Sequence, residues 1–128
     1  MSKTVLTFGV ITILILIAGV FLLTRNDSTT STPGETTLPE SHQYFWSKTC
    51  PHCTKVNEFM QTWKGKDEFE MEKIDVNESK ENTVLFLDKG TKICKKPASK
   101  LGVPLLITPE GRCLSGDVSI IEYLKGVI

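Results

Sequence analysis

Near its N-terminus the chain has a long stretch of mostly apolar residues, and from residue 42 onward its apolar positions are periodic. Residues 5–23 run for nineteen positions without a charge, between Lys3 and Arg25. A helix of that length can cross the hydrocarbon core of a bilayer. A cleaved signal peptide is the alternative, but the run ends in FLLTRND, which lacks the small residues of a cleavage site. The pattern therefore favours a retained transmembrane anchor at residues 1–25.

The stretch after the anchor has no apolar period. Residues 26–40 are rich in Ser, Thr and Pro, a composition that cannot bury a core and is typical of a flexible linker. The folded domain is then expected at residues 41–128. Lys3 and the N-terminal amine outweigh Arg25 by a small margin, which favours a domain on the extracytoplasmic side. We expect a single-pass membrane protein that contacts lipid through its first helix.

Within the domain, the period of the apolar positions changes from one element to the next. Residues 42–47, HQYFWS, have the pattern of a short buried strand. A helical face follows the cysteines at positions 50 and 53, and it is made of Val56, Phe59, Met60 and Trp63. Residues 69–76 alternate between apolar and charged positions, which predicts a second strand.

The second half of the domain continues the alternation of helices and strands. Residues 78–94 are predicted as a helix that ends near Gly90, although the apolar run VLFL at 84–87 also fits a strand. In residues 103–116, two apolar runs flank Pro-Glu-Gly-Arg, which predicts a β-hairpin. Asp117 is predicted to cap a last helix, whose apolar positions are Ile120, Ile121, Leu124 and Val127. The order β-α-β-α-β-β-α predicts an α/β domain with a mixed central sheet.

The balance of charges excludes one class of partner. Lys and Arg together number 15, as do Asp and Glu, so no overall field attracts nucleic acid. The one basic cluster, residues 92–100, is interpreted as a solvated lysine face.

Two cysteines stand where the first strand meets the helix, in the motif CPHC. Cys50 would lie at the helix N-terminus, where free amide groups and the macrodipole stabilise a thiolate. Cys53 can close a disulfide with it, and Pro51 suits the first turn because its missing N–H is not needed there. His52 is expected to favour the thiolate further; an imidazole that only projects into solvent is the alternative.

The CPHC motif and the element order resemble the thioredoxin superfamily in its compact, glutaredoxin-sized form. The resemblance covers nearly all of residues 42–128, through YFWSKTCPHC and LGVPLLITPEGRCLSG. The Pro-His dipeptide is similar to that of the periplasmic DsbA-type oxidases, although the chain has no room for their helical insertion. The resemblance implies a cis Pro104 that faces the cysteine pair and a Val103 backbone that pairs with a substrate strand. Thioredoxins also carry a buried aspartate in the strand before the active site, whereas residues 42–47 contain no acid.

Two further cysteines lie outside this motif. In the inferred topology, Cys94 ends the second helix and Cys113 follows the hairpin turn, both at the pole of the sheet away from Cys50. A structural disulfide between them would contribute about 3 kcal/mol, and two buried free thiols are the alternative. Eighteen residues separate the two, which fits no zinc ribbon, so no metal is expected.

These features predict a membrane-tethered thiol–disulfide oxidoreductase that uses no cofactor. Its expected partners are protein thiols or disulfides and a membrane redox protein that reoxidises or reduces the pair. The Pro-His dipeptide and the missing acid favour an oxidase, and a dedicated reductase is the nearest alternative. A metal-delivery module would instead bind a soft ion through Cys50, Cys53 and His52 or His42. A redox-inert domain that makes only protein contacts is the third alternative.

Overall fold

The computed structural model describes residues 37–127, in which four strands form one mixed sheet. β1 runs parallel to β2 and antiparallel to β3, and β3 runs antiparallel to β4, in the order β2-β1-β3-β4. The strands are β1 (His42–Trp46), β2 (Met71–Asp75), β3 (Leu105–Ile107) and β4 (Cys113–Ser115). The predicted anchor and residues 26–36 of the predicted linker lie outside the described residues. Within residues 37–127, no helix combines the length and the apolar character that a membrane span requires.

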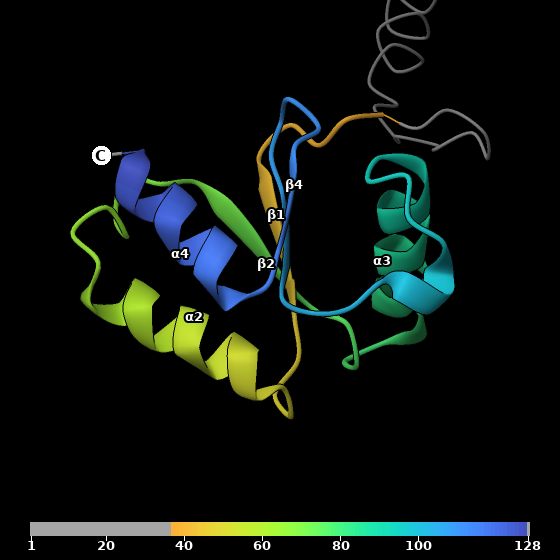
Figure 1. Ribbon diagram of the computed structural model, residues 1–128, viewed down its shortest axis with the longest axis horizontal. Helices are drawn as coiled ribbons and strands as arrows, with labels where there is room; N and C mark the ends of the chain where they lie inside the picture. The colour runs from red at the N-terminus through yellow and green to blue at the C-terminus, as the bar shows by residue number, and fades with distance from the viewer. Residues whose placement is uncertain (1–36, 128) are drawn as a thin grey trace, which may run out of the picture. The chain divides into compact units, whose positions relative to one another are not determined.

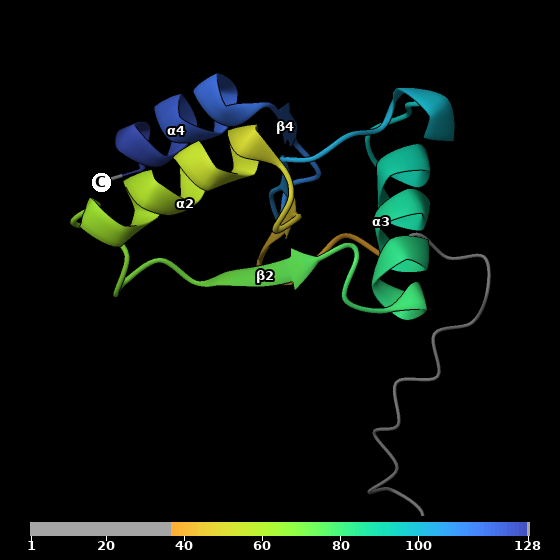
Figure 2. The same cartoon turned by 90° about the horizontal axis from the view of Figure 1, so that it is seen from below.

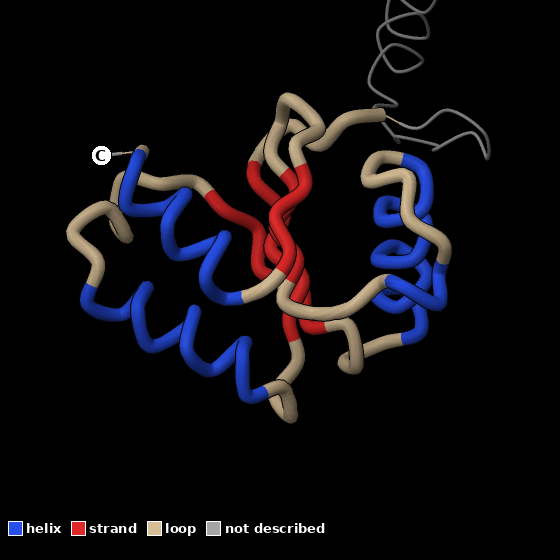
Figure 3. Tube along the Cα trace, viewed as in Figure 1, coloured by secondary structure: helices blue, strands red, loops and turns tan. Residues whose placement is uncertain are grey.

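Within residues 37–127, three α-helices cover the two faces of the sheet. α2 and α4 lie side by side on one face, and α3 lies on the other (Figures 1 and 2). The helices are α2 (Pro51–Thr62), α3 (Lys80–Lys92) and α4 (Asp117–Gly126), with a short 3₁₀ helix, η1 (Ala98–Lys100), after α3. The predicted order of strands and helices is confirmed, and η1 is the one addition (Figure 3).

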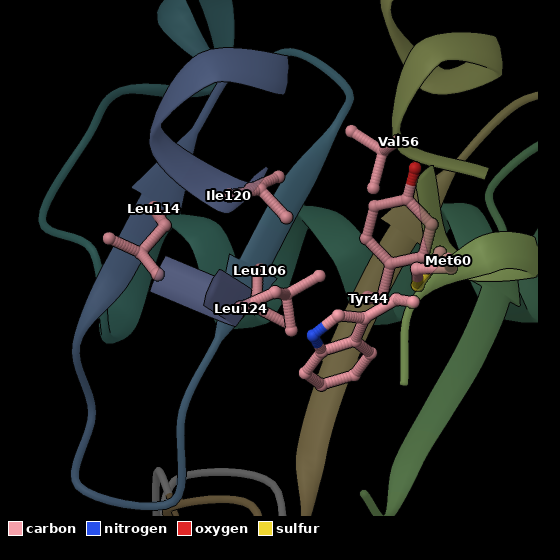
Figure 4. Packing of buried hydrophobic residues seen from close by; sticks show 8 residues of the cluster. Tyr44, Val56, Met60, Leu106, Leu114, Ile120 and Leu124 are labelled. Carbon is pink, nitrogen blue, oxygen red and sulfur yellow. The ribbon is translucent and has the colours of Figure 1, made fainter. Parts of the chain in front are cut away.

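The sheet separates two hydrophobic cores. The core on the side of α2 and α4 consists of Tyr44, Val56, Met60, Trp63, Leu106, Leu114, Ile120 and Leu124, and Figure 4 shows the ring of Tyr44 beside Val56 and Met60. The core on the side of α3 consists of Phe45, Ile74, Val76, Phe86, Leu105 and Ile107. Successive residues of a strand point to opposite faces of the sheet. Because helices cover both faces, β1 and β3 contain apolar residues at consecutive positions.

Local signals explain where α3 begins. The Ser79 hydroxyl accepts a hydrogen bond from the amide of Asn82 at 3.1 Å, which caps the first turn. The Thr83 hydroxyl donates to the Val76 carbonyl at 2.7 Å and ties the helix to the end of β2. The apolar run at 84–87 therefore belongs to a helix, and the strand alternative is excluded.

Two details of the last helix differ from the prediction. Gly116, and not Asp117, occupies the N-cap of α4, and Asp117 is its first helical residue. The carboxylate of Asp117 binds the side chains of His52 and Lys55 on α2. Val127 lies beyond the helix end and is 40% exposed, so it does not continue the buried face.

Candidate active site

Cys50 and Cys53 form a disulfide at the start of α2. Cys50 is the N-cap residue with extended backbone, Pro51 is the first helical residue, and the Cα atoms of the two cysteines lie 5.2 Å apart. β1 ends at Trp46, and the amide of Cys50 donates to the Ser47 carbonyl at 3.2 Å, which closes the turn between strand and helix. The arrangement of a reducible bond at a strand-to-helix junction is the one that the motif predicts.

The two cysteines differ in exposure. Cys53 is fully buried, whereas Cys50 is partly exposed. An incoming thiolate can therefore reach the sulfur of Cys50, and it would displace Cys53 as the leaving group. Disulfide exchange depends on which sulfur is open to attack, so burial assigns the two cysteines different chemical roles.

The helix N-terminus supplies positive potential at Cys50. The amide of Cys53 donates to the Cys50 sulfur at 3.1 Å, and the first turn of α2 contains no acidic residue. Unpaired amide groups and the helix dipole favour negative charge at this position. When the disulfide is reduced, the sulfur of Cys50 is placed to be held as a thiolate.

The loop before β3 meets the same sulfur from the other side. The carbonyl oxygen of Val103 lies 3.5 Å from the Cys50 sulfur, and the Val103–Pro104 peptide bond is cis. The Pro104 carbonyl accepts a hydrogen bond from the amide of Gly116 at 3.0 Å. The carbonyl of Val103 thus lies beside Cys50, and the bond that follows it has the cis form that the resemblance implies.

His52 bonds to a carboxylate that the motif does not contain. Its Nδ1 lies 2.9 Å from Oδ1 of Asp117, and Lys55 Nζ lies 3.4 Å from Oδ2 of the same carboxylate. Desolvation alone would raise the pKa of Asp117, but hydrogen bonds from His52, its own backbone amide and Lys55, together with the charge of Lys55, outweigh it and lower the pKa. Asp117 is therefore an ionised partner to the imidazole of His52 and the ammonium group of Lys55.

Polar side chains hold the turn that carries Cys50. Asn77 donates from Nδ2 to the Ser47 hydroxyl at 2.8 Å, and its amide donates to Oδ1 of Asp75 at 3.0 Å. The buried Asp75 also has Lys48 Nζ at 3.8 Å from Oδ2. These bonds join the turn at residues 47–49 to the end of β2, because Trp46 and Asp75 are register partners.

Cys94 and Cys113 form the second disulfide. The bridge joins the segment after α3 to the first residue of β4, with Cα atoms 5.7 Å apart. Cys113 pairs with Ile107, which pairs with Gln43 near the start of β1. The redox motif follows the end of β1, so the two disulfides lie at opposite poles of the sheet, and the alternative of two free thiols is excluded.

The two histidines are far apart in the fold. His42 begins β1, where its Nε2 lies 2.8 Å from the Tyr123 hydroxyl and its ring contacts Phe69, whereas His52 follows the other end of the strand. Between residues 37 and 127, no three His, Cys, Asp or Glu side chains gather in a way that could hold a metal ion.

Two residues at this site were missed by the reasoning from sequence. Asp117 was assigned only to helix capping, and Lys55 was assigned nothing. His52 and Lys55 are three residues apart and share one face of α2. Two hydrogen-bond donors on one helical face indicate a carboxylate partner, although the pattern does not identify which acidic residue of the chain it is.

Comparison of the chain with known proteins identifies no relative. No family model, no curated protein and no solved structure matches the chain.

Proposed function

We propose that this chain is a thiol–disulfide oxidoreductase of thioredoxin-like fold that oxidises protein thiols through Cys50 and Cys53. One observation carries the proposal: a disulfide at a helix N-terminus joins a partly exposed cysteine, Cys50, to a fully buried one, Cys53. A structural bridge has no need of that asymmetry. The mixed sheet, the order of the elements and the loop at Val103 and Pro104 are further support.

The geometry suggests a two-step exchange. A substrate thiolate attacks the sulfur of Cys50; the new bond forms as the Cys50–Cys53 bond breaks, and Cys53 leaves as a thiolate that takes up a proton. A second thiolate of the substrate then attacks the substrate sulfur of the mixed disulfide and releases Cys50 as a thiolate. Two electrons pass from the substrate dithiol to the pair, and the second substrate proton goes to solvent.

The surroundings of Cys53 favour the oxidase direction. β1 carries no carboxylate, and the group that bonds to the carbonyl of Cys53 is the hydroxyl of Tyr44. Burial raises the pKa of that hydroxyl, so it stays protonated at neutral pH and is no base for the Cys53 thiol. A reductase needs Cys53 to be deprotonated as it resolves a mixed disulfide, whereas an oxidase benefits from a stable Cys50 thiolate in the reduced product.

We further propose that the domain is tethered to the membrane through residues 1–25 and faces the extracytoplasmic side. The second disulfide supports an oxidising compartment, because structural disulfides persist there. A membrane redox protein would then return the pair to its disulfide form. An extended substrate segment would pair with the backbone at Val103, next to the exposed sulfur.

A titration against glutathione tests both the activity and its direction. The purified full-length chain in detergent micelles is equilibrated with glutathione buffers, and the redox state of Cys50 is read by alkylation. An oxidase is expected to show a potential nearer that of DsbA, about −120 mV, than that of thioredoxin, about −270 mV. A value near the lower figure would support the dedicated reductase instead.

Trapping identifies the partners and supplies the control. Cys53→Ala should accumulate mixed disulfides at Cys50 with many secreted chains and one membrane protein. Cys50→Ser should accumulate none, and the double variant Cys94→Ser/Cys113→Ser should turn over thiols like the parent chain. Absence of both thiol oxidation and trapped species would refute the proposed function.

A further inference from the structure

Asp117 and the residue before it contact two segments that lie next to Cys50. Its carboxylate binds Nδ1 of His52 at 2.9 Å, and the residue before it, Gly116, donates its amide to the Pro104 carbonyl at 3.0 Å. The carbonyl of Val103, the residue before Pro104, lies 3.5 Å from the sulfur of Cys50. Cys50 precedes His52 by two residues. The start of α4 therefore contacts both structures that flank the exposed sulfur.

The carboxylate of Asp117 is less exposed to solvent than the two side chains that bind it. The Asp117 side chain is 14% exposed, whereas the side chains of His52 and Lys55 are 63% and 61% exposed. Gly116 alone connects β4 to α4, so the backbone fixes the position of Asp117. The longer side chains of His52 and Lys55 extend toward its carboxylate. The imidazole is thus oriented by Asp117 and not the reverse.

This contact also decides which ring nitrogen carries a proton. An ionised carboxylate only accepts hydrogen bonds, so Nδ1 of His52 must be the donor. In the neutral ring, Nε2 is then the nitrogen without a proton. A carboxylate that fixes a histidine through one ring nitrogen leaves the other free for chemistry.

We propose that Asp117 is a positioning residue of the redox site, which fixes the tautomer and orientation of His52 and thereby makes the Cys50–Cys53 pair more oxidising. This inference rests on the proposed function. His52 lies in the first turn of α2, two residues after Cys50. A positive charge on its ring would stabilise the thiolate of Cys50, and a stabilised thiolate favours the reduced pair. The charge of Asp117 itself has the opposite effect on the thiolate, but Lys55 offsets it at 3.4 Å.

A purely structural role for Asp117 predicts something different. An acidic residue in the first turn of α4 interacts favourably with the helix dipole whether or not His52 is present. Its removal would then lower the stability of the domain without changing the redox equilibrium. The reduction potential separates the two roles because helix stability alone does not move it.

A double-mutant cycle provides the test, with the full-length chain and glutathione buffers as the probe. Asp117→Asn is expected to make the pair less oxidising by about threefold to tenfold in the equilibrium constant, tenfold being about 30 mV. In the His52→Ala background, Asp117→Asn should leave the equilibrium constant of the Cys50–Cys53 pair with glutathione unchanged. An equal shift in both backgrounds, or no shift in either, would overturn the inference. Urea denaturation of each variant establishes that it is folded.

A spectroscopic measurement tests the positioning independently of activity. The ¹⁵N shifts of His52, recorded at a pH where the ring is neutral, should show a protonated Nδ1 in the parent chain. Asp117→Asn should lose that preference, while Lys55→Gln should keep it. A chain that exchanges thiols but has a protonated Nε2 would refute the inference and leave the proposed function intact. A chain with the expected tautomer but no thiol exchange would refute the proposed function.

Discussion

The hydroxyl of Tyr44 donates a hydrogen bond to the backbone carbonyl of Cys53 across 3.4 Å. This bond links β1 to the first turn of α2, which contains the buried cysteine. The ring is fully buried in the core between the sheet and α2. Since the pKa of the hydroxyl is raised by burial, the group acts as a donor over the whole neutral range. Its contribution is to hold the first turn of α2 in place.

Substitution Tyr44→Phe separates this support from proton transfer. The variant keeps the ring and loses one hydrogen bond, so the free energy of unfolding should fall by about 1 kcal/mol. The rate of thiol exchange at pH 7 should stay within about twofold, since a protonated hydroxyl exchanges no proton with Cys53. Urea denaturation and a thiol-oxidation assay measure the two quantities. A large loss of rate at unchanged stability would show that the hydroxyl takes part in the chemistry.

The apolar periods were sufficient to predict the order of the elements. Val56 and Met60 lie four residues apart on one buried helical face, and Leu105 and Leu106 face opposite cores, as their patterns require. The ambiguous run at 84–87 was settled by contacts outside it, namely the Ser79 cap and the bond from Thr83 to β2. The local pattern of apolar residues identifies a helix or a strand well when one face of it is buried. Where the pattern fits both, tertiary contacts decide between them.

The site was only half predictable for a related reason. Cys50, Cys53 and His52 are neighbours in sequence, so their motif brings them together in any helix. Asp117 is 65 residues from His52, and their contact depends on how α2 and α4 lie side by side on the sheet. No sequence period encodes that placement.

The bridge between Cys94 and Cys113 is expected to stabilise the domain without affecting its chemistry. Its removal in Cys94→Ser/Cys113→Ser frees a loop of eighteen residues in the unfolded chain and should cost about 3 kcal/mol. The reduction potential of the Cys50–Cys53 pair should not change, because the two disulfides lie at opposite poles. Urea denaturation and glutathione titration of the same preparations measure both. A shifted potential would contradict the separation of the two sites.

Gly116 is predicted to be intolerant of any side chain. Its backbone has φ 88° and ψ 157°, a conformation that is essentially restricted to glycine, while a Cβ there would meet no atom within 4 Å. Gly116→Ala should therefore cost about 1–3 kcal/mol through backbone strain alone. Gly126→Ala is the matched control, since its Cβ also meets open space and α4 ends at that residue, so stability should be unchanged or higher. Equal stability of the two variants in urea would contradict the strain.

His42 should make the domain less stable as the pH falls from 7 to 5. Burial, the largest effect, lowers the pKa of His42 below its ordinary value of 6.5, although the charge of Glu110 and a hydrogen bond with the backbone of Glu70 oppose it. Because the folded pKa lies below the unfolded one, the unfolded chain takes up the proton first. The contribution of His42 is therefore complete above about pH 6.5 and is lost as the pH falls through the folded pKa.

The variant His42→Gln isolates this effect. Glutamine does not titrate and can keep a hydrogen bond to the Tyr123 hydroxyl, which lies 2.8 Å from Nε2 of His42. The urea midpoint of the parent chain should fall between pH 7 and pH 5 more steeply than that of the variant. His52 is unchanged in the variant, so its contribution cancels in the difference between the two slopes. Parallel slopes would contradict the lowered pKa, and a steeper slope for the variant would show that protonated His42 is stabilised in the fold, with the charge of Glu110 outweighing the cost of burial.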